Sequence, residues 1–419
     1  MRPPGFVSVV PLLFVGLIGA TAVGARVVGP AAQQPRPAPA GLESFVALPS
    51  PAAEGAGQPS LTTDATGRVW MSWLEPMTGG GFTFKVTSLI GAAWTAPITV
   101  VEGPRLLANW ADFPSVFAAA DGTLAAHWLE RSATSSGYGI RMRTSSDAGK
   151  TWSATQTPHR DDAATAEHGF VSFFDAPGGG IGLAWLDGRE AASHMSSAGA
   201  MALRATMLRT GRLGEDTLVD PRVCDCCQTS AARTASGAVV AYRDRSDKEI
   251  RDISVVAFRN GRWSAPVGVH ADGWEISGCP INGPAIAASG QSVAVAWFTR
   301  AGNDPRVNVA FSTDEGRTFG PPIRVGDATA LGRVGVVMPD GDRALVLALE
   351  KTEAGARLVL RDITRNGGMG EPAVVSAATP DRTGGFARIA LSGRRVLVAW
   401  TDVRPGARSR VAVAASALR

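Results

Sequence analysis

Four cysteines carry the most distinctive chemistry in this 419-residue sequence. Cys224, Cys226 and Cys227 fall within four consecutive positions, and Cys279 follows in the segment GWEISGCPINGP. An even number of cysteines in an exported chain predicts disulfides. The simplest pairing joins Cys279 to one member of the cluster and bridges the other two.

Two other kinds of chemistry suit the same cysteines. Clustered thiolates bind copper or zinc, with His168 and His194 as candidate extra ligands. Thiols that cycle between reduced and oxidised forms are the third alternative. The sequence leaves all three interpretations open.

A second set of reactive side chains follows a motif that recurs along the chain, an apolar run that ends in an aromatic residue and a charged turn. The turns supply Glu75, Glu130, Arg131, Asp187, Arg189, Glu190, Arg243, Asp244, Arg245, Arg300, Asp402 and Arg404. Convergent arginines bind anions, and paired carboxylates act as general acid and base. Salt bridges between neighbouring repeats are the alternative.

Individual roles follow from these residue types. The candidate catalytic residues are Asp187, Asp244 and Tyr242, and the candidate ligand-binding residues are Arg189, Arg243, Arg245, Trp274, Asn282, Arg300 and Arg404. Trp274 and Asn282 are included because an exposed tryptophan beside amide and carboxylate groups commonly holds sugar rings.

The spacing of the motif predicts the elements that position these residues. Its aromatic positions are Trp73, Trp128, Trp185, Tyr242, Trp297 and Trp400, with Leu349 in the sixth place, at intervals of 51 to 57 residues. Each repeat contains four β-like segments, which is typical of a propeller blade. We therefore predict an all-β, seven-bladed β-propeller. Six blades remain the alternative if residues 332–375 form something else.

Ring closure and the common rim follow from this arrangement. The last repeat, residues 384–417, has only three strands, and we expect residues 43–48 to supply the fourth and remove an open edge. Connections between blades lie on the same face as the charged turns. All four cysteines are therefore expected in one region of that face.

Two turns share the pattern S-x-D-x-G-x-T-[WF], at residues 145–152 and 312–319. The aspartate accepts backbone N–H bonds, the glycine takes positive φ and the aromatic residue packs between blades. The residues concerned are Asp147, Gly149, Trp152, Asp314, Gly316 and Phe319. The pattern resembles the Asp-box, or BNR repeat, of the sialidase-like propeller superfamily, in which these turns are structural.

The resemblance implies a possible exo-α-sialidase activity, which in the superfamily uses an arginine triad, a Tyr–Glu pair and an aspartate. This chain has two tyrosines, Tyr138 and Tyr242, and lacks the Arg-Ile-Pro type segment. We therefore expect a ligand- or glycan-binding module or scaffold. A divergent glycoside hydrolase and a copper- or zinc-handling or redox protein are the alternatives.

The remaining features concern location and partners. Residues 1–25 read as a signal peptide or membrane anchor, residues 26–41 as a Pro/Ala-rich linker and residues 42–419 as the propeller. The protein is thus expected in the periplasm or secreted, at the membrane only if the N-terminal segment is uncleaved. A net charge of +4 without a Lys/Arg run argues against nucleic acid. A glycan, a small anionic ligand or an extracytoplasmic protein is the expected partner.

Overall fold

The computed structural model describes Met1 and residues 41–161, 165–193, 200–327 and 329–419. The predicted signal segment, most of the linker and His194 lie outside the described residues. The following account concerns the compact unit that begins at Pro37. Among the described residues, no helix is long and apolar enough to cross a membrane.

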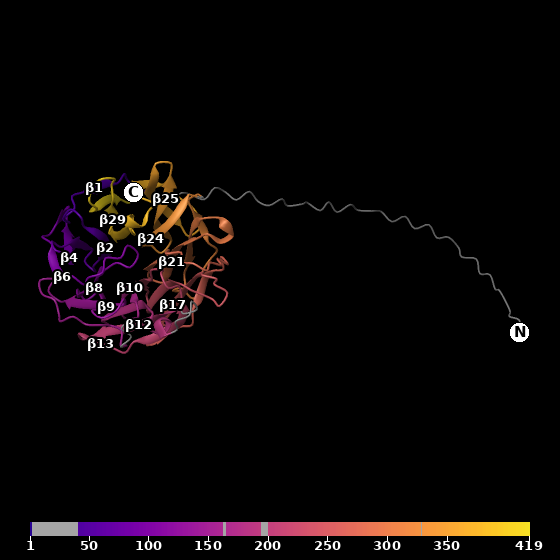
Figure 1. The fold of residues 1–419 in the computed structure, drawn as a ribbon. Helices are drawn as coiled ribbons and strands as arrows, with labels where there is room; N and C mark the ends of the chain where they lie inside the picture. Colours follow the sequence, from indigo (N-terminus) through magenta and orange to yellow (C-terminus); the bar gives the residue numbers. More distant parts are fainter. Residues whose placement is uncertain (2–40, 162–164, 194–199, 328) are drawn as a thin grey trace. The chain divides into compact units, whose positions relative to one another are not determined.

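Seven antiparallel sheets are arranged around a common axis (Figure 1). Blade 1 contains β2 (Gly57–Thr63), β3 (Val69–Pro76), β4 (Phe82–Ile90), β5 (Ala93–Trp94) and β6 (Ile98–Gly103). Blade 2 contains β7 (Ser115–Ala118), β8 (Leu124–Arg131) and β9 (Tyr138–Ser145). Blade 3 contains β10 (His168–Asp175), β11 (Ile181–Asp187), β12 (Met201–Arg209), β13 (Arg212–Leu213) and β14 (Thr217–Val223). In blade 2 a bridge between Met142 and Gln156 stands in place of a fourth strand.

The other four blades follow the same plan. Blade 4 contains β15 (Ser230–Arg233), β16 (Ala238–Arg243), β17 (Ile253–Arg259), β18 (Arg262–Trp263) and β19 (Val267–His270), and blade 5 contains β20 (Ala285–Ser289), β21 (Ser292–Thr299), β22 (Arg306–Ser312) and β23 (Ile323–Val325). Blade 6 contains β24 (Ala330–Asp340), β25 (Arg343–Thr352), β26 (Gly355–Thr364) and β27 (Ala373–Ala378). Blade 7 contains β28 (Arg388–Ser392), β29 (Arg395–Asp402), β30 (Arg410–Ala417) and β1 (Val46–Leu48). Helical turns are limited to α1 (Arg189–Ser193), η1 (Ala301–Asn303) and η2 (Arg382–Gly384) among the described residues.

The ring is closed as predicted, by a strand from the N-terminal side of the chain. The N-terminal strand β1 pairs with β30, with Val46 opposite Ala415, and thereby completes the last blade. In Figure 1 the C-terminus lies beside β1 and β29. Residues 330–378 form a complete four-stranded sheet, β24 to β27. The seven-bladed prediction is therefore confirmed, and the six-bladed alternative is wrong.

The core lies between neighbouring blades and is built from their second strands. Every residue of β11 and of β16 is buried, because each strand packs both faces against adjacent blades. The recurring aromatic residues occupy this layer, and Trp73, Trp128, Trp185 and Trp297 are among the largest fully buried side chains. Burying a side chain of this size stabilises the fold by about 2–3 kcal/mol. The period in the sequence is thus the period of blade packing.

The two S-x-D-x-G-x-T-[WF] turns have the expected internal bonding. Asp147 accepts hydrogen bonds from the Ser145 hydroxyl at 2.7 Å and from the backbone N–H of Thr151 at 2.9 Å. Gly149 has a φ of 84°, in the left-handed region that favours glycine. These turns join the third strand to the outer segment, at the end of the sheet opposite the charged loops.

Candidate functional site

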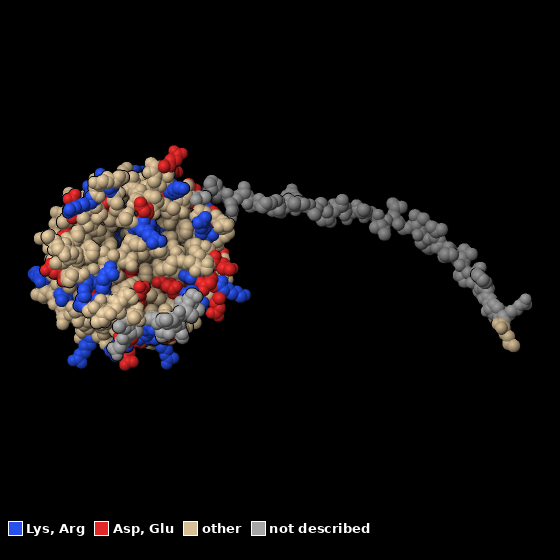
Figure 2. Space-filling model, in the orientation of Figure 1, with Lys and Arg blue, Asp and Glu red and all other residues tan. Residues whose placement is uncertain are grey.

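The charged turns and the connections between blades meet at one face of the propeller. In blade 3, for example, His168 at the start of β10 pairs with Asp187 at the end of β11. Figure 2 shows that basic and acidic side chains are interspersed over the surface that faces the viewer. Opposite charges are therefore mixed on this surface.

Several carboxylates of this face accept hydrogen bonds from the buried aromatic residues. The indole N–H of Trp73 donates to Glu75 at 2.7 Å, and that of Trp185 donates to Asp187 at 2.8 Å. Trp297 donates to Asp272 at 2.6 Å. In each case the carboxylate satisfies the one polar atom of a buried ring. These acids are parts of the blade architecture.

Tyr242 follows the same rule. It is fully buried in β16, and its hydroxyl donates to Asp220 at 2.6 Å. Burial raises the pKa of Tyr242, and the negative charge of Asp220 adds to the shift. A buried phenol with a raised pKa is a poor nucleophile, so the structure places this candidate in the packing layer.

Asp187 and Arg189 form a closed ion-pair cluster. Arg189 Nε lies 2.7 Å from Asp187, and its Nη2 lies 2.7 Å from Asp216. Arg204 adds a contact of 3.2 Å to Asp216. Burial opposes ionisation of Asp216, but the hydrogen bonds from Arg189 and from the backbone N–H of Arg160, together with the charges of Arg189 and Arg204, outweigh this and lower its pKa. Asp187 and Arg189 therefore neutralise charges within blade 3, whereas the salt-bridge alternative expected such pairs between neighbouring repeats.

Blade 4 holds a second closed network. The Arg243 guanidinium is buried and donates to the carbonyls of Asn282, Phe298 and Arg251 at 2.6 to 3.0 Å. It lies 4.9 Å from the centre of the Trp274 ring, which is itself buried. Arg243 and Trp274 thus hold the connection between blades 4 and 5 together instead of facing solvent.

The other candidates in blades 4 and 5 are also engaged. Asn282 accepts the backbone N–H of Arg333 at 2.7 Å, and Asp244 accepts the Ser254 hydroxyl at 2.9 Å. Burial raises the pKa of Asp244. Arg245 bridges Asp225 and Glu249, each at 2.9 Å.

Arg300 and Arg404 lie at the surface. Arg300 is exposed after the end of β21, and Arg404 is paired with Asp402 at 3.0 Å. Arg300 follows two residues after Phe298, whose carbonyl accepts a bond from Arg243, and Arg404 belongs to the last blade. The ligand-binding residues proposed from the sequence are thus distributed over several clusters.

A group that the sequence analysis did not identify joins blades 2 and 3. The rings of His159 and His168 stack at 3.9 Å, and both lie beside Asp161. His159 Nδ1 is 2.9 Å and His168 Nε2 is 3.1 Å from the same carboxylate oxygen. Burial of Asp161 is outweighed by these hydrogen bonds, and its pKa is lowered. His168 was expected near the cysteines, but its contacts are His159, Asp161 and Asp187.

These groups border a cavity of about 260 Å³, which we call the rim pocket. Its lining includes Arg105, Glu130, Arg131, Tyr138, Arg141, His159, Asp161 and His168. Arg105 is paired with Glu130 at 2.8 Å, whereas Arg131 is exposed at the edge of the pocket. Glycine at position 139 leaves room for the His159 ring, because a Cβ at this position would lie only 2.8 Å from His159 Nε2.

Tyr138 connects this pocket to a buried acid. Its hydroxyl lies 3.4 Å from Asp112, which also accepts the N–H of Phe170 at 2.6 Å. Burial raises the pKa of Asp112 to about 7. Asp112 borders a separate cavity of about 210 Å³ lined by the inner strands of several blades. A carboxylic acid that is half protonated near neutral pH is suited to proton transfer.

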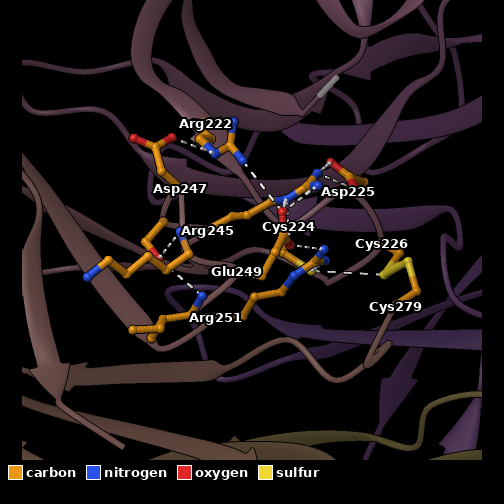
Figure 3. A network of polar contacts seen from close by, with 12 residues as sticks. Arg222, Cys224, Asp225, Cys226, Arg245, Asp247, Glu249, Arg251 and Cys279 are labelled. Atoms are coloured by element: carbon orange, nitrogen blue, oxygen red, sulfur yellow. Dashed lines mark hydrogen bonds and ion pairs between the residues drawn. A yellow bond between two sulfur atoms is a disulfide. The ribbon is translucent and has the colours of Figure 1, made fainter. Parts of the chain in front are cut away.

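The cysteines meet where blades 3, 4 and 5 are connected (Figure 3). Cys226 and Cys279 form a disulfide, and Cys224 and Cys227 are buried with their sulfur atoms 2.9 Å apart. Cys224 Sγ lies 3.9 Å from Cys226 Sγ. This arrangement agrees with the predicted pairing of Cys279 with one member of the cluster, whereas the predicted bridge between the other two is not formed, because Cys224 and Cys227 are free thiols.

The surroundings of Cys224 disfavour a metal. Arg251 Nη1 lies 3.5 Å from Cys224 Sγ, and the positive charge of Arg243 also acts on this thiol. Two guanidinium groups stabilise a thiolate but repel a cation. Because Cys226 is held in the disulfide, only two thiols remain as sulfur ligands. Copper or zinc therefore fits this site poorly.

The missed residues share a cause. His159, Asp161 and Asp112 fall in connections between blades, and Arg105 and Arg141 lie outside the motif that marked the other candidates. The run HRDD at residues 159–162 was a usable signal, since histidine next to acids often marks a polar site.

Comparisons with known proteins found only distant structural similarity. No family model and no curated protein matches this chain. A protein of unknown function from Dyadobacter fermentans is 15% identical over 90% of this chain and 98% of its own, with a TM-score of 0.49. An α-L-arabinanase from Penicillium chrysogenum is 12% identical over 90% and 99%, with a TM-score of 0.48. A leech intramolecular trans-sialidase is 9% identical over 89% and 93%, with a TM-score of 0.48. At this level the likeness concerns the fold alone.

Proposed function

We propose that this protein binds a small anionic ligand, of the acidic-sugar class, in the rim pocket between blades 2 and 3. The observation that carries the proposal is the placement of Arg105, Arg131 and Arg141 around one cavity. Arginine binds carboxylates through paired N–H groups, and such bonds are stronger than neutral ones. The predicted signal peptide supports an exported location for this activity.

The pocket also supplies groups for the uncharged part of a sugar. His159, Asp161 and Glu130 offer donors and acceptors for hydroxyl groups, and Tyr138 offers an aromatic surface. Burial lowers the pKa of His159, so its ring is largely neutral at pH 7. The arginines therefore supply positive charge that does not depend on His159.

Calorimetric titration with uronic acids, sialic acid and their neutral counterparts tests this function. We expect binding of acidic sugars only, and Arg131→Ala and Arg141→Ala should each weaken it roughly 10-fold, as loss of a charged hydrogen bond does. Arg262→Ala, an exposed arginine in β18, is the matched control and should leave Kd unchanged. Equal binding of neutral sugars, or unchanged Kd in both pocket variants, would refute the proposal.

A glycoside hydrolase is the second candidate, favoured by one observation. Asp112, with a pKa of about 7, is buried and is connected to the rim pocket through the hydroxyl of Tyr138, 3.4 Å from its carboxylate. A general acid needs such a pKa. Release of the fluorophore from fluorogenic glycosides, and its loss in Asp112→Asn but not in Asp244→Asn, would support hydrolysis over binding alone.

A further inference from the structure

We propose that the four cysteines form a thiol–disulfide exchange site, in which the buried pair Cys224 and Cys227 exchanges with the surface disulfide Cys226–Cys279. The external substrate class is a small disulfide or thiol that reaches Cys279. This activity is separate from ligand binding in the rim pocket, because the cysteines lie among blades 3, 4 and 5.

The positions of the sulfur atoms define an order of reaction. Cys279 is exposed and Cys226 is partly buried, whereas Cys224 and Cys227 are 0% and 1% exposed. Cys224 Sγ is 2.9 Å from Cys227 Sγ and 3.9 Å from Cys226 Sγ. A small thiol from solvent therefore meets the disulfide first, and Cys224 is the sulfur that connects the disulfide to the buried pair.

The electrostatic environment makes Cys224 the nucleophile. Arg251 Nη1 lies 3.5 Å from the Cys224 sulfur. Glu249 in turn pairs with Arg251 at 2.8 Å, and Figure 3 labels all three residues. Arg243 donates to backbone carbonyls, which leave its charge unneutralised. Burial opposes ionisation, but the hydrogen bond from Cys227 and these charges lower the pKa of Cys224 to about 6. The thiolate is the reactive form in disulfide exchange.

Two balanced steps transfer the disulfide inward. In the first, the Cys224 thiolate attacks Cys226 Sγ; the Cys224–Cys226 bond forms, the Cys226–Cys279 bond breaks, and the electron pair leaves on Cys279, which takes a proton from solvent. In the second, Cys227 loses its proton and attacks Cys224. The Cys224–Cys227 bond forms and Cys226 leaves as a thiolate. No external oxidant or reductant is consumed.

The exposed dithiol then reacts with a small external disulfide. Cys279 attacks that disulfide and releases one external thiol, and Cys226 resolves the mixed disulfide and releases the other. The chain thus passes two electrons from its buried pair to the substrate. Two equivalents of an external thiol reverse these steps, leave as one external disulfide and return Cys224 and Cys227 to the dithiol form.

The full-length variant Cys227→Ser isolates the first step. With three cysteines left, the chain holds one disulfide, either Cys226–Cys279 with a free Cys224 or Cys224–Cys226 with a free Cys279. The purified variant is quenched in acid, treated with N-ethylmaleimide and mapped by mass spectrometry. We expect both isomers, with Cys279 alkylated in a measurable fraction. Only Cys226–Cys279, in folded protein, would overturn the proposal.

The unmodified protein provides a second measurement that does not depend on a variant. After equilibration in glutathione buffers of graded potential, its two-electron-reduced form should contain two isomers, the Cys226–Cys279 disulfide of the structure and a Cys224–Cys227 disulfide with free Cys226 and Cys279. Cys224→Ser should lose every disulfide except Cys226–Cys279. Stoichiometric copper or zinc retained by Cys224 and Cys227, or thiols there that never pair at any potential, would refute exchange.

Discussion

Asp187 accepts a hydrogen bond from the indole of Trp185 at 2.8 Å and an ion pair from Arg189 at 2.7 Å. The side chain of Asp187 is fully buried, so the carboxylate satisfies two groups that would otherwise be left unpaired between blades. A residue that looks catalytic in the sequence is therefore an organising element of blade 3.

Replacing this carboxylate should destabilise the protein strongly. Asp187→Ala removes the partner of both Trp185 and Arg189, and breaking a buried pair costs about 3–5 kcal/mol. Urea unfolding should show this loss. Glu371→Ala, at an exposed position, should change the free energy of unfolding by less than about 0.5 kcal/mol. An Asp187→Ala variant as stable as the control would contradict the assignment.

The pH dependence of stability should report Asp112. Its folded pKa, raised by burial to about 7, exceeds the ordinary value of 3.8. The folded state thus holds a proton that the unfolded state releases, and stability falls as pH rises from about 4 to about 7, by at most about 1.4 kcal/mol per unit. Asp112→Asn should flatten this slope in urea titrations between pH 5 and 8. A slope identical to that of the unmodified protein would count against a raised pKa.

The turn aspartate Asp314 should behave in the opposite sense. Burial opposes its ionisation, but hydrogen bonds from Thr318 and Ser312 outweigh it and lower the pKa to about 2. Its contribution is present above pH 3.8 and is lost as pH falls through about 2. Asp314→Ala should cost about 1 kcal/mol at pH 7 and progressively less toward pH 2. Thermal unfolding at both pH values measures this, with Asp314→Asn, which keeps one acceptor oxygen, as the milder comparison.

Arg251 should control the ionisation of Cys224. In reduced protein, thiolate absorbance at 240 nm should contain a component with a midpoint near pH 6 that is missing from Cys224→Ser. Arg251→Met removes the guanidinium 3.5 Å from the sulfur and should shift that midpoint upward. Glu249→Gln, which removes the charge facing Arg251, should shift it slightly downward. An unchanged midpoint in Arg251→Met would mean that Arg243 and Cys227 lower the pKa of Cys224 without a contribution from Arg251.

The architecture could be derived from the sequence because it depends on local, repeated signals. A buried second strand needs apolar residues at regular intervals, and the spacing of Trp73, Trp128, Trp185 and Trp297 records that requirement directly. The closing strand was predictable for a similar reason. A final blade with three strands leaves an edge, and residues 43–48 were expected to fill it, as β1 does by pairing with β30.

Only the tertiary structure decided which charged residues face a ligand. The rings of His159 and His168 stack across a blade connection, and Arg243 turns inward to backbone carbonyls. The spacing of these residues along the sequence does not reveal either contact. Side-chain direction at a loop depends on which partners the fold brings within hydrogen-bond range. The repeat in the sequence therefore determined the ring, and the pairing of charges across blades determined where that ring has an open polar pocket.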